Sequence, residues 1–258
     1  MTDRQPDFVI VGATKSATTW LQRNLQQHSA VFMPGAETHY FSRNFEQGPA
    51  WYGAFFKPAA AHQIVGERSN SYLDHPEAPR RLRAVLPDVR LIVQLRNPIE
   101  RALADCRSHF RHGAAAADVD RNPGMDGADA DRLHAGGLYY RHLSRFLELF
   151  PREQLCVTLY DDLDREPASV LNRIRAHIGL APTKVGGSAP LPGPVQPVGG
   201  TTRRGASHAA VGRRARHPEL SDALRARLRA YYEADVQALS DLLGRDLTSW
   251  LGPTRARA

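Results

Sequence analysis

Residues 8–21 read Phe-Val-Ile-Val-Gly-Ala-Thr-Lys-Ser-Ala-Thr-Thr-Trp-Leu. The first five form a short apolar run that ends in glycine, which is typical of a strand buried on both faces of a parallel sheet. After the turn, Trp20, Leu21 and Leu25 recur at helical spacing. We therefore predict a strand, a tight turn and a helix. Backbone N–H groups and the positive end of the helix converge in such a turn, so it favours an anion.

The side chains of this turn exceed what capping a helix requires. Lys15 adds a mobile positive charge, and hydroxyl groups flank it at Thr14, Ser16, Thr18 and Thr19. Short hydroxyl side chains alone would fit a plain helix cap, but together with the lysine they indicate an anion site. The lysine comes too soon after Gly12 for a nucleotide-triphosphate loop, and no Gly-Lys-Ser/Thr follows. This spacing disfavours a kinase.

Beyond this first unit, apolar runs and helical patterns alternate along the chain. Further strands are expected at 65–67, 90–95 and 154–160, and helices at 18–27, 79–86, 98–110, 138–149, 166–178 and 218–243. This alternation predicts an α/β fold, a three-layer P-loop-like domain with a mostly parallel central sheet flanked by helices. Ligands of such sheets bind at the carboxyl ends of the strands, where the Gly12 turn and Arg96 both fall.

One domain is expected to span residues 1–251. Within it, residues 113–137 are rich in Ala, Asp and Gly and are predicted to form a flexible insertion or lid. Residues 181–217 read as a Pro-, Gly- and Arg-rich loop. The C-terminal helix at 218–243 should place Tyr231 on its apolar face, and residues 252–258 are expected to be a disordered tail.

The bulk composition limits the partners. The chain has 258 residues, a formal net charge of +7 and a sequence pI of about 9.8, so it attracts anions. Nucleic acid is one such partner, but the arginines are spread along the chain and aromatic stacking motifs are missing. No apolar run approaches the ~20 residues that span a membrane, and no signal peptide is evident, so a cytoplasmic location is expected. Cys106 and Cys156 are isolated, which predicts buried thiols and no metal site.

Residues 15–21 resemble the Lys-Ser-Gly-Thr-Thr-Trp-Leu turn of sulfotransferases, which use 3′-phosphoadenosine 5′-phosphosulfate (PAPS) as donor. In that family the turn grips the 5′-phosphosulfate. The resemblance implies a donor-binding segment made of Thr14, Lys15, Ser16, Ala17, Thr18, Thr19 and Trp20. Ala17 replaces the glycine of the family.

Residues 95–103 resemble the second phosphate-binding element of the family, a strand followed by Arg-Asn/Asp-Pro and a helix. The resemblance implies that Arg96 holds the 3′-phosphate. The family's partner serine falls on Ala104, so Ser108 one helical turn further, or a loop arginine, would have to substitute. A late basic loop closes over the nucleotide in the family. Its candidates are Arg203 with Arg204 and Arg213 with Arg214, and a solvated basic run fits either pair equally well.

Residues 37–41, Glu-Thr-His-Tyr-Phe, resemble a segment of the branch that includes heparan-sulfate sulfotransferases and related bacterial enzymes. There the glutamate is the general base, which implies this role for Glu37. The acceptor must lose a proton as it attacks sulfur, and a carboxylate can take it. His39 is the other candidate base, with a packed structural histidine as its alternative. Arg68 lies where some members carry a lysine near the sulfonate, and Asn70 replaces a common proline.

The sequence thus predicts a PAPS-dependent sulfotransferase (EC 2.8.2.-) that needs no metal. Its acceptor would be a hydroxyl or amine of a carbohydrate, a lipid or a secondary metabolite, with a weak preference for an anionic one. The alternatives are a P-loop kinase that transfers phosphate from ATP, and third a basic nucleic-acid-binding module. The oligomeric state is open.

Overall fold

The computed structural model describes residues 4–110, 134–181 and 222–252. Within these residues a five-stranded sheet has the strand order β2-β3-β1-β4-β5, and every pairing is parallel. The strands are β1 (Phe8–Gly12), β2 (Val31–Phe32), β3 (Ile64–Arg68), β4 (Arg90–Leu95) and β5 (Leu155–Leu159). The predicted α/β fold is confirmed, and the carboxyl ends of the strands meet at one edge of the sheet.

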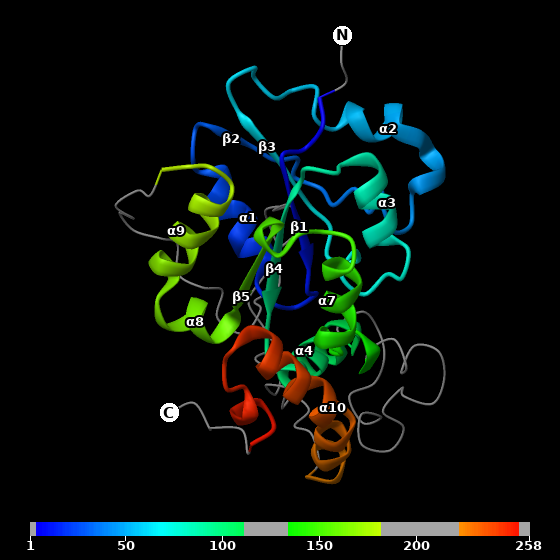
Figure 1. The fold of residues 1–258 in the computed structure, drawn as a ribbon, viewed down its shortest axis with the longest axis vertical. Helices are drawn as coiled ribbons and strands as arrows, with labels where there is room; N and C mark the ends of the chain where they lie inside the picture. The colour runs from blue at the N-terminus through cyan, green and yellow to red at the C-terminus, as the bar shows by residue number, and fades with distance from the viewer. Residues whose placement is uncertain (1–3, 111–133, 182–221, 253–258) are drawn as a thin grey trace, which may run out of the picture.

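Helices cover both faces of this sheet. The α-helices are α1 (Thr18–Gln26), α2 (Gly48–Ala54), α3 (Ala78–Val85), α4 (Pro98–Phe110), α7 (Tyr139–Leu147), α8 (Tyr160–Arg165), α9 (Pro167–His177) and α10 (Asp222–Leu243). The short 3₁₀ helices are η1 (Phe45–Gln47), η2 (Arg152–Gln154) and η3 (Thr248–Trp250). In Figure 1, α1, α8 and α9 lie on one side of the strands and α3 and α7 on the other, which gives three layers. Among the described helices, none has both the length and the apolar character that crossing a bilayer requires.

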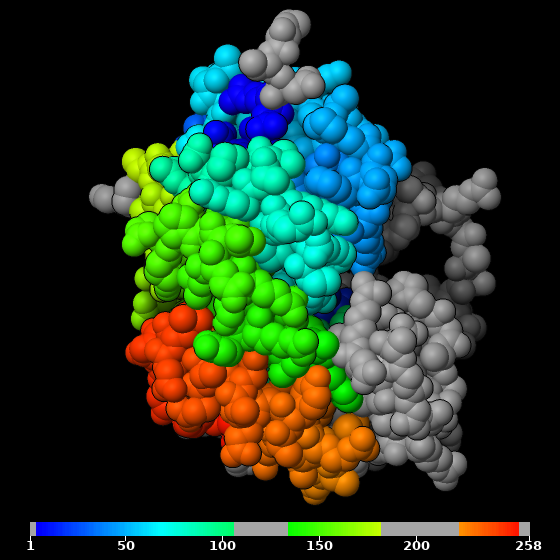
Figure 2. Space-filling view, turned by 45° about the vertical axis from the view of Figure 1, so that its right-hand side comes forward, coloured from blue at the N-terminus to red at the C-terminus, as the bar shows by residue number. Residues whose placement is uncertain are grey.

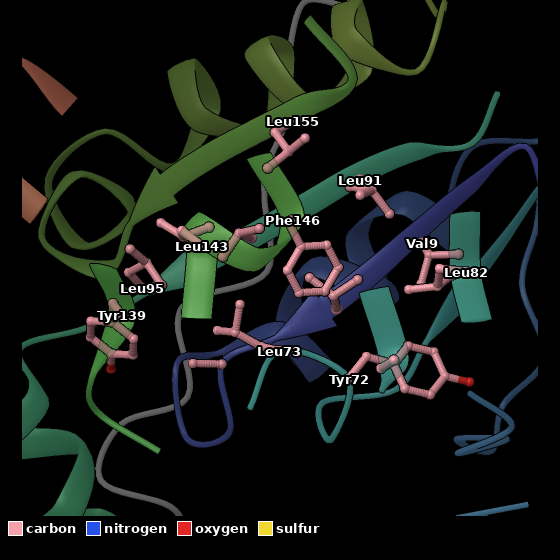
Figure 3. Packing of buried hydrophobic residues seen from close by; sticks show 14 of the residues in the cluster. Val9, Tyr72, Leu73, Leu82, Leu91, Leu95, Tyr139, Leu143, Phe146 and Leu155 are labelled. Carbon is pink, nitrogen blue, oxygen red and sulfur yellow. The ribbon is translucent and has the colours of Figure 1, made fainter. Parts of the chain in front are cut away.

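The two faces of β1 form two separate hydrophobic cores. Val9 and Val11 pack with residues of α3, α7 and α10, whereas Phe8 and Ile10 pack with residues of α1 and α9. Since all five residues of β1 are buried, a continuous apolar run is what this central strand needs. Figure 3 shows the first core, where strand and helix side chains meet at Val9, Leu91, Leu155, Leu82, Leu143 and Phe146.

A close approach of β1 and β3 depends on a glycine. Phe8 is paired in register with Gly66, and a Cβ on Gly66 would lie 2.1 Å from the Phe8 ring. The ring of Phe8 therefore occupies the space that any larger residue at position 66 would fill.

The C-terminal segment is joined to the carboxyl edge of the sheet. Helix α10 packs on α4 and α7, and Figure 2 shows α7 and α10 side by side on the surface. Beyond α10, Trp250 donates from its indole to Asp161 (2.6 Å), and its carbonyl accepts a hydrogen bond from the Asn97 amide (2.9 Å). Asn97 also caps α4, because its Oδ1 accepts from the backbone N–H of Ile99 (2.9 Å). The turn after β4 is thus held from two sides.

Several expectations about the elements need correction. Tyr231 is 45% exposed and Tyr232 faces the core instead, because the buried positions of α10 follow four-residue steps from Leu224 and Leu228. The expected strand 154–160 ends one residue earlier, since Tyr160 begins α8. Elements β2, α2 and α8 were not predicted. Gly244 follows the last residue of α10 with φ +60°, in the left-handed region that favours glycine at the end of a helix.

Parts of the predicted organisation lie outside the described residues. These are residues 113–133 of the expected insertion, 182–221 of the expected basic loop and helix start, and 253–258 of the expected tail. The end of the expected insertion is described and is packed: a Cβ on Gly137 would meet Tyr232 and Pro98. The insertion therefore returns to the core before α7 begins.

Candidate functional site

The turn between β1 and α1 has an unusual backbone. Lys15 and Ala17 both adopt left-handed conformations, with φ of 63° and 65°, and Ala17 is the residue that precedes α1. These conformations let the chain reverse tightly at the positive end of the helix. Ser16 is fully buried and Thr18 almost so, whereas Thr19 is exposed. Trp20 packs into the second core, beneath the turn.

Lys15 lies beside an acid of α4. Its Nζ is 3.8 Å from Asp105 Oδ1, and Asp105 Oδ2 is in turn 3.5 Å from Arg101. Arg101 is buried, so the carboxylate bridges a buried cation and the partly exposed lysine. This arrangement keeps the Lys15 ammonium near the turn.

Arg96 joins the turn after β4 to the turn after β1. Its Nη1 donates to the Lys15 carbonyl (3.1 Å), and its guanidinium carbon lies 4.7 Å from the centre of the Tyr160 ring. The aromatic face stabilises the cation and restricts its direction. The two predicted phosphate-binding elements are therefore adjacent, with Ala104 on the following helix.

Some predicted donor-site residues cannot be placed. Ser108 belongs to α4, but its side chain lies outside the described part of the structure. Four arginines of the basic segment also lie outside the described part of the structure: Arg203, Arg204, Arg213 and Arg214. Their role in donor binding stays a prediction.

Glu37 is held by three donors at the end of β3. Arg68 donates from Nη1 to Glu37 Oε1, the Asn70 backbone N–H donates to Oε2 (2.8 Å), and the Asn70 amide donates to Oε1 (3.1 Å). The Glu37 side chain is 21% exposed, so its carboxylate is fixed in direction yet still reachable. Asn70, which stands where the related segment has proline, supplies two of these hydrogen bonds.

His39 lies on the other side of Glu37. Its Nε2 is 3.8 Å from Glu37 Oε2, and its Nδ1 shares a hydrogen bond with Ser71 Oγ (2.8 Å). Burial lowers the pKa of His39, which the Glu37 charge partly offsets. The neutral imidazole is therefore favoured at neutral pH. Its backbone N–H donates to Ser69 Oγ (2.9 Å), so the residue is also part of the loop's framework.

The buried carboxylate of Glu67 supports the loop that carries Glu37 and His39. Glu67 is fully buried and accepts hydrogen bonds from four hydroxyl groups: Thr38, Tyr52, Tyr72 and Ser69. Burial raises the pKa of Glu67, and the hydroxyl donors counteract part of this effect. Because Thr38 lies between Glu37 and His39 in the chain, its bond to Glu67 fixes the position of both. A glutamate directly after the short apolar run of Ile64, Val65 and Gly66 was the signal for this role.

Sequence reasoning missed several side chains that contact predicted site residues, among them Gln22, Asp105 and Tyr160. Gln22 accepts a hydrogen bond from Arg68 Nε (2.6 Å), Asp105 faces Lys15, and Tyr160 lies under Arg96. Gln22 carried no clear signal in the sequence, since it reads as a polar position of an amphipathic helix, whereas the structure buries it. Within the described ranges, no cluster of three or more His, Cys, Asp or Glu side chains is placed to hold a metal ion.

The parallel sheet and the tight turn between its central strand and α1 define a P-loop-like α/β protein. A family model described as the sulfotransferase domain matches residues 5–190. The chain therefore belongs to the sulfotransferase family, as the resemblance of its motifs predicted.

Individual relatives agree with this membership. The chain is 34% identical over 191 residues to human heparan sulfate glucosamine 3-O-sulfotransferase 6, a match covering 69% of this chain and 53% of the relative. It is 27% identical over 281 residues to the bifunctional heparan sulfate N-deacetylase/N-sulfotransferase 1 of Caenorhabditis briggsae, covering 95% of this chain and 31% of the relative. The chain thus matches about half, or less, of the length of these curated relatives.

A solved structure resembles nearly the whole chain. The crystal structure of a sulfotransferase from Alicyclobacillus acidocaldarius has a TM-score of 0.71 and 25% identity, and the match covers 96% of this chain and 99% of that one. A sulfotransferase domain from the curacin biosynthetic pathway, with a TM-score of 0.51 and 16% identity, shares the fold.

Proposed function

We propose that this protein transfers a sulfonate group from PAPS to a hydroxyl or amine of an acceptor, with Glu37 as general base. The observation that carries the proposal is the adjacency of the turns after β1 and β4, which are both predicted to bind phosphate and are joined by the hydrogen bond from Arg96 to the Lys15 carbonyl. A donor phosphorylated at both its 5′ and 3′ positions matches two such turns. Arg68 is the last residue of β3, which neighbours β1 in the sheet, and its partner Glu37 follows β2, so the pair belongs to the same edge.

Each residue has a distinct task in the proposed reaction. The donor supplies an activated sulfonate and a phosphate leaving group. Glu37 takes the proton of the acceptor while the new bond to sulfur forms and the bond from sulfur to the phosphate oxygen breaks. Lys15 neutralises the charge that grows on that oxygen, assisted by the backbone N–H groups at the start of α1. Arg96 holds the 3′-phosphate, and Arg68 lies beside the base, where it can neutralise the sulfonate.

The acceptor that we favour is a carbohydrate. The curated relatives are named for heparan sulfate, one of them for O-sulfation of its glucosamine and another for N-sulfation, and hydroxyl and amine acceptors both fit the chemistry proposed for Glu37. The net charge of +7 supports an anionic glycan among such acceptors.

The proposal is tested by sulfonate transfer from radiolabelled PAPS to a panel of glycan acceptors. We expect Lys15→Ala to lower kcat about 10²–10³-fold, as is common when one charge-stabilising donor is removed. Lys57→Ala is the matched control, because Lys57 is an exposed lysine, and it should retain activity. In a thermal-shift assay adenosine 3′,5′-bisphosphate should stabilise the wild type. Stabilisation by ATP with Mg²⁺ in its place would contradict the proposal and favour a kinase.

The base is tested in the same assay by Glu37→Gln. Loss of the proton acceptor should lower kcat about 10²–10⁴-fold while leaving the binding of adenosine 3′,5′-bisphosphate intact. Glu153→Gln serves as control, since Glu153 is exposed and precedes the opposite end of β5. Normal turnover by Glu37→Gln would show that Glu37 is not the base and would favour His39 in that role.

A further inference from the structure

The guanidinium of Arg68 is held on two sides. Its Nη1 donates to Glu37 Oε1, and its Nε donates to Gln22 Oε1 (2.6 Å). Arg68 and Gln22 are both buried, with 7% and 4% of their surface exposed. Because a guanidinium is planar and rigid, fixing Nε also fixes the direction of Nη1. The hydrogen bond to Gln22 therefore affects the direction in which Arg68 donates to Glu37.

Gln22 is itself fixed in one orientation. While its Oε1 accepts from Arg68, its Nε2 donates to the Pro34 carbonyl (2.7 Å). Rotating the amide would place two donors face to face at Arg68 and two acceptors face to face at Pro34. Leaving such buried groups without partners costs more than a hydrogen bond contributes when made. The orientation of the amide is therefore specified from both ends.

We infer that Gln22 is a positioning residue for the proposed sulfonate transfer, acting through Arg68 on the direction of the Glu37 carboxylate. The inference rests on the proposed function of Glu37. Small misplacements of a reacting group are costly in rate, so a side chain that fixes Arg68 affects turnover without touching the acceptor. Gln22 belongs to α1, the helix that begins at the Lys15 turn, so the same helix carries the anion site and orients the base.

The competing explanation is that Gln22 only ties α1 to the segment at residues 33–34. The same helix offers a matched control, because Gln26 donates from its own Nε2 to the Met33 carbonyl (3.0 Å). Gln26 therefore makes the same type of link, one turn further along α1, and its described partner is a backbone carbonyl. Substituting each glutamine by methionine keeps side-chain length and removes the amide.

We expect Gln22→Met to lower kcat about tenfold, the effect of losing one hydrogen bond to a charged group. Its affinity for adenosine 3′,5′-bisphosphate should stay at the wild-type value, and Gln26→Met should change neither quantity. A similar loss of kcat in both variants, or a wild-type kcat in Gln22→Met, would overturn the inference.

A double-mutant cycle with Arg68→Lys separates positioning from a structural effect. Lysine has an ammonium group in place of the planar guanidinium. In that background Gln22 therefore has no guanidinium to orient. We expect Gln22→Met to cause its tenfold loss of kcat with arginine at position 68 and no further loss with lysine there. Equal losses in both backgrounds would show that Gln22 does not act through Arg68.

A readout that needs no activity keeps this inference distinct from the proposed function. The Nε–H proton of Arg68, assigned in an NMR spectrum by its disappearance in Arg68→Lys, should exchange slowly with water in the wild type and in Gln26→Met. It should exchange fast in Gln22→Met. If it stays protected in Gln22→Met, the inference fails. If it behaves as expected but the wild type transfers no sulfonate to any acceptor, the proposed function fails instead.

Discussion

At the scale of the single residue, Ala17 stands in a conformation that suits glycine. Its φ is 65°, and it directly precedes α1. A Cβ in the left-handed region comes close to the following carbonyl oxygen, which costs free energy that glycine does not incur. The related family turn has glycine at this position, so the alanine retains the turn at some expense in stability.

We predict that Ala17→Gly stabilises the protein by about 1 kcal/mol, the strain relieved less the added flexibility of the unfolded chain. Urea denaturation measures this change. The control is Ala230→Gly, at an exposed position inside α10, which should instead destabilise by about 1 kcal/mol. A loss of stability in Ala17→Gly comparable to that of the control would contradict the account.

At the scale of the element, Gly66 limits how β1 and β3 pack. A Cβ at this position would lie 2.1 Å from Phe8 Cζ, far inside van der Waals contact. We predict that Gly66→Ala lowers the free energy of unfolding by about 1–3 kcal/mol, as overpacking of a core does. Part of this loss should be recovered in the background of Phe8→Leu, since a smaller side chain leaves space.

Gly35→Ala is the control for this substitution, because a Cβ there meets nothing within 4 Å. It should leave the midpoint of urea denaturation almost unchanged. If both alanine variants lose the same stability, the contact with Phe8 is not what position 66 provides.

The helices and strands differ in how well the sequence predicts them. The continuous apolar runs of β1 and β4 fill buried positions, so the pattern and the structure coincide. Strand β2 has only two residues and is defined by its pairing with β3, which no local pattern reveals. The missed helix α8 begins directly where β5 ends, leaving no turn residues to mark the boundary.

For the candidate site, the chemistry could be predicted better than the contacts. Lys15, Arg96 and Glu37 belong to motifs that are continuous in sequence, and those of Lys15 and Arg96 directly follow predicted strands. The contact of Gln22 with Arg68 joins residues 46 positions apart, and a glutamine in an amphipathic helix usually indicates a solvent-facing position. Such partners become visible only when the helix is placed on the sheet.

At the scale of the whole molecule, stability should depend on the protonation of a buried histidine in α7. His142 is 3% exposed, and its Nε2 shares a hydrogen bond with the Ala135 carbonyl (2.7 Å). Burial lowers the pKa of His142 from 6.5 to about 4. The folded state therefore favours the neutral ring, so its stabilising contribution is present above pH 6.5 and is lost as pH falls towards 4.

We predict that this residue accounts for about 3 kcal/mol of the stability lost between pH 7 and pH 4, since each unit of pKa shift corresponds to about 1.4 kcal/mol. Denaturation curves at a series of pH values should show a shallower pH dependence for His142→Gln than for the wild type. His62→Gln, at an exposed histidine, should follow the wild-type slope. Parallel curves for the wild type and His142→Gln would refute the prediction.

The attachment of Trp250 to Asn97 and Asp161 has a consequence for synthesis on the ribosome. The strands and the turns that follow β1 and β4 leave the exit tunnel well before residue 250 does. Until that residue emerges, the Asn97 amide lacks its carbonyl partner and the turn that carries Arg96 is held from one side only. A nascent chain can therefore assemble its sheet early, yet it completes the Arg96 turn only after residue 250 has left the exit tunnel.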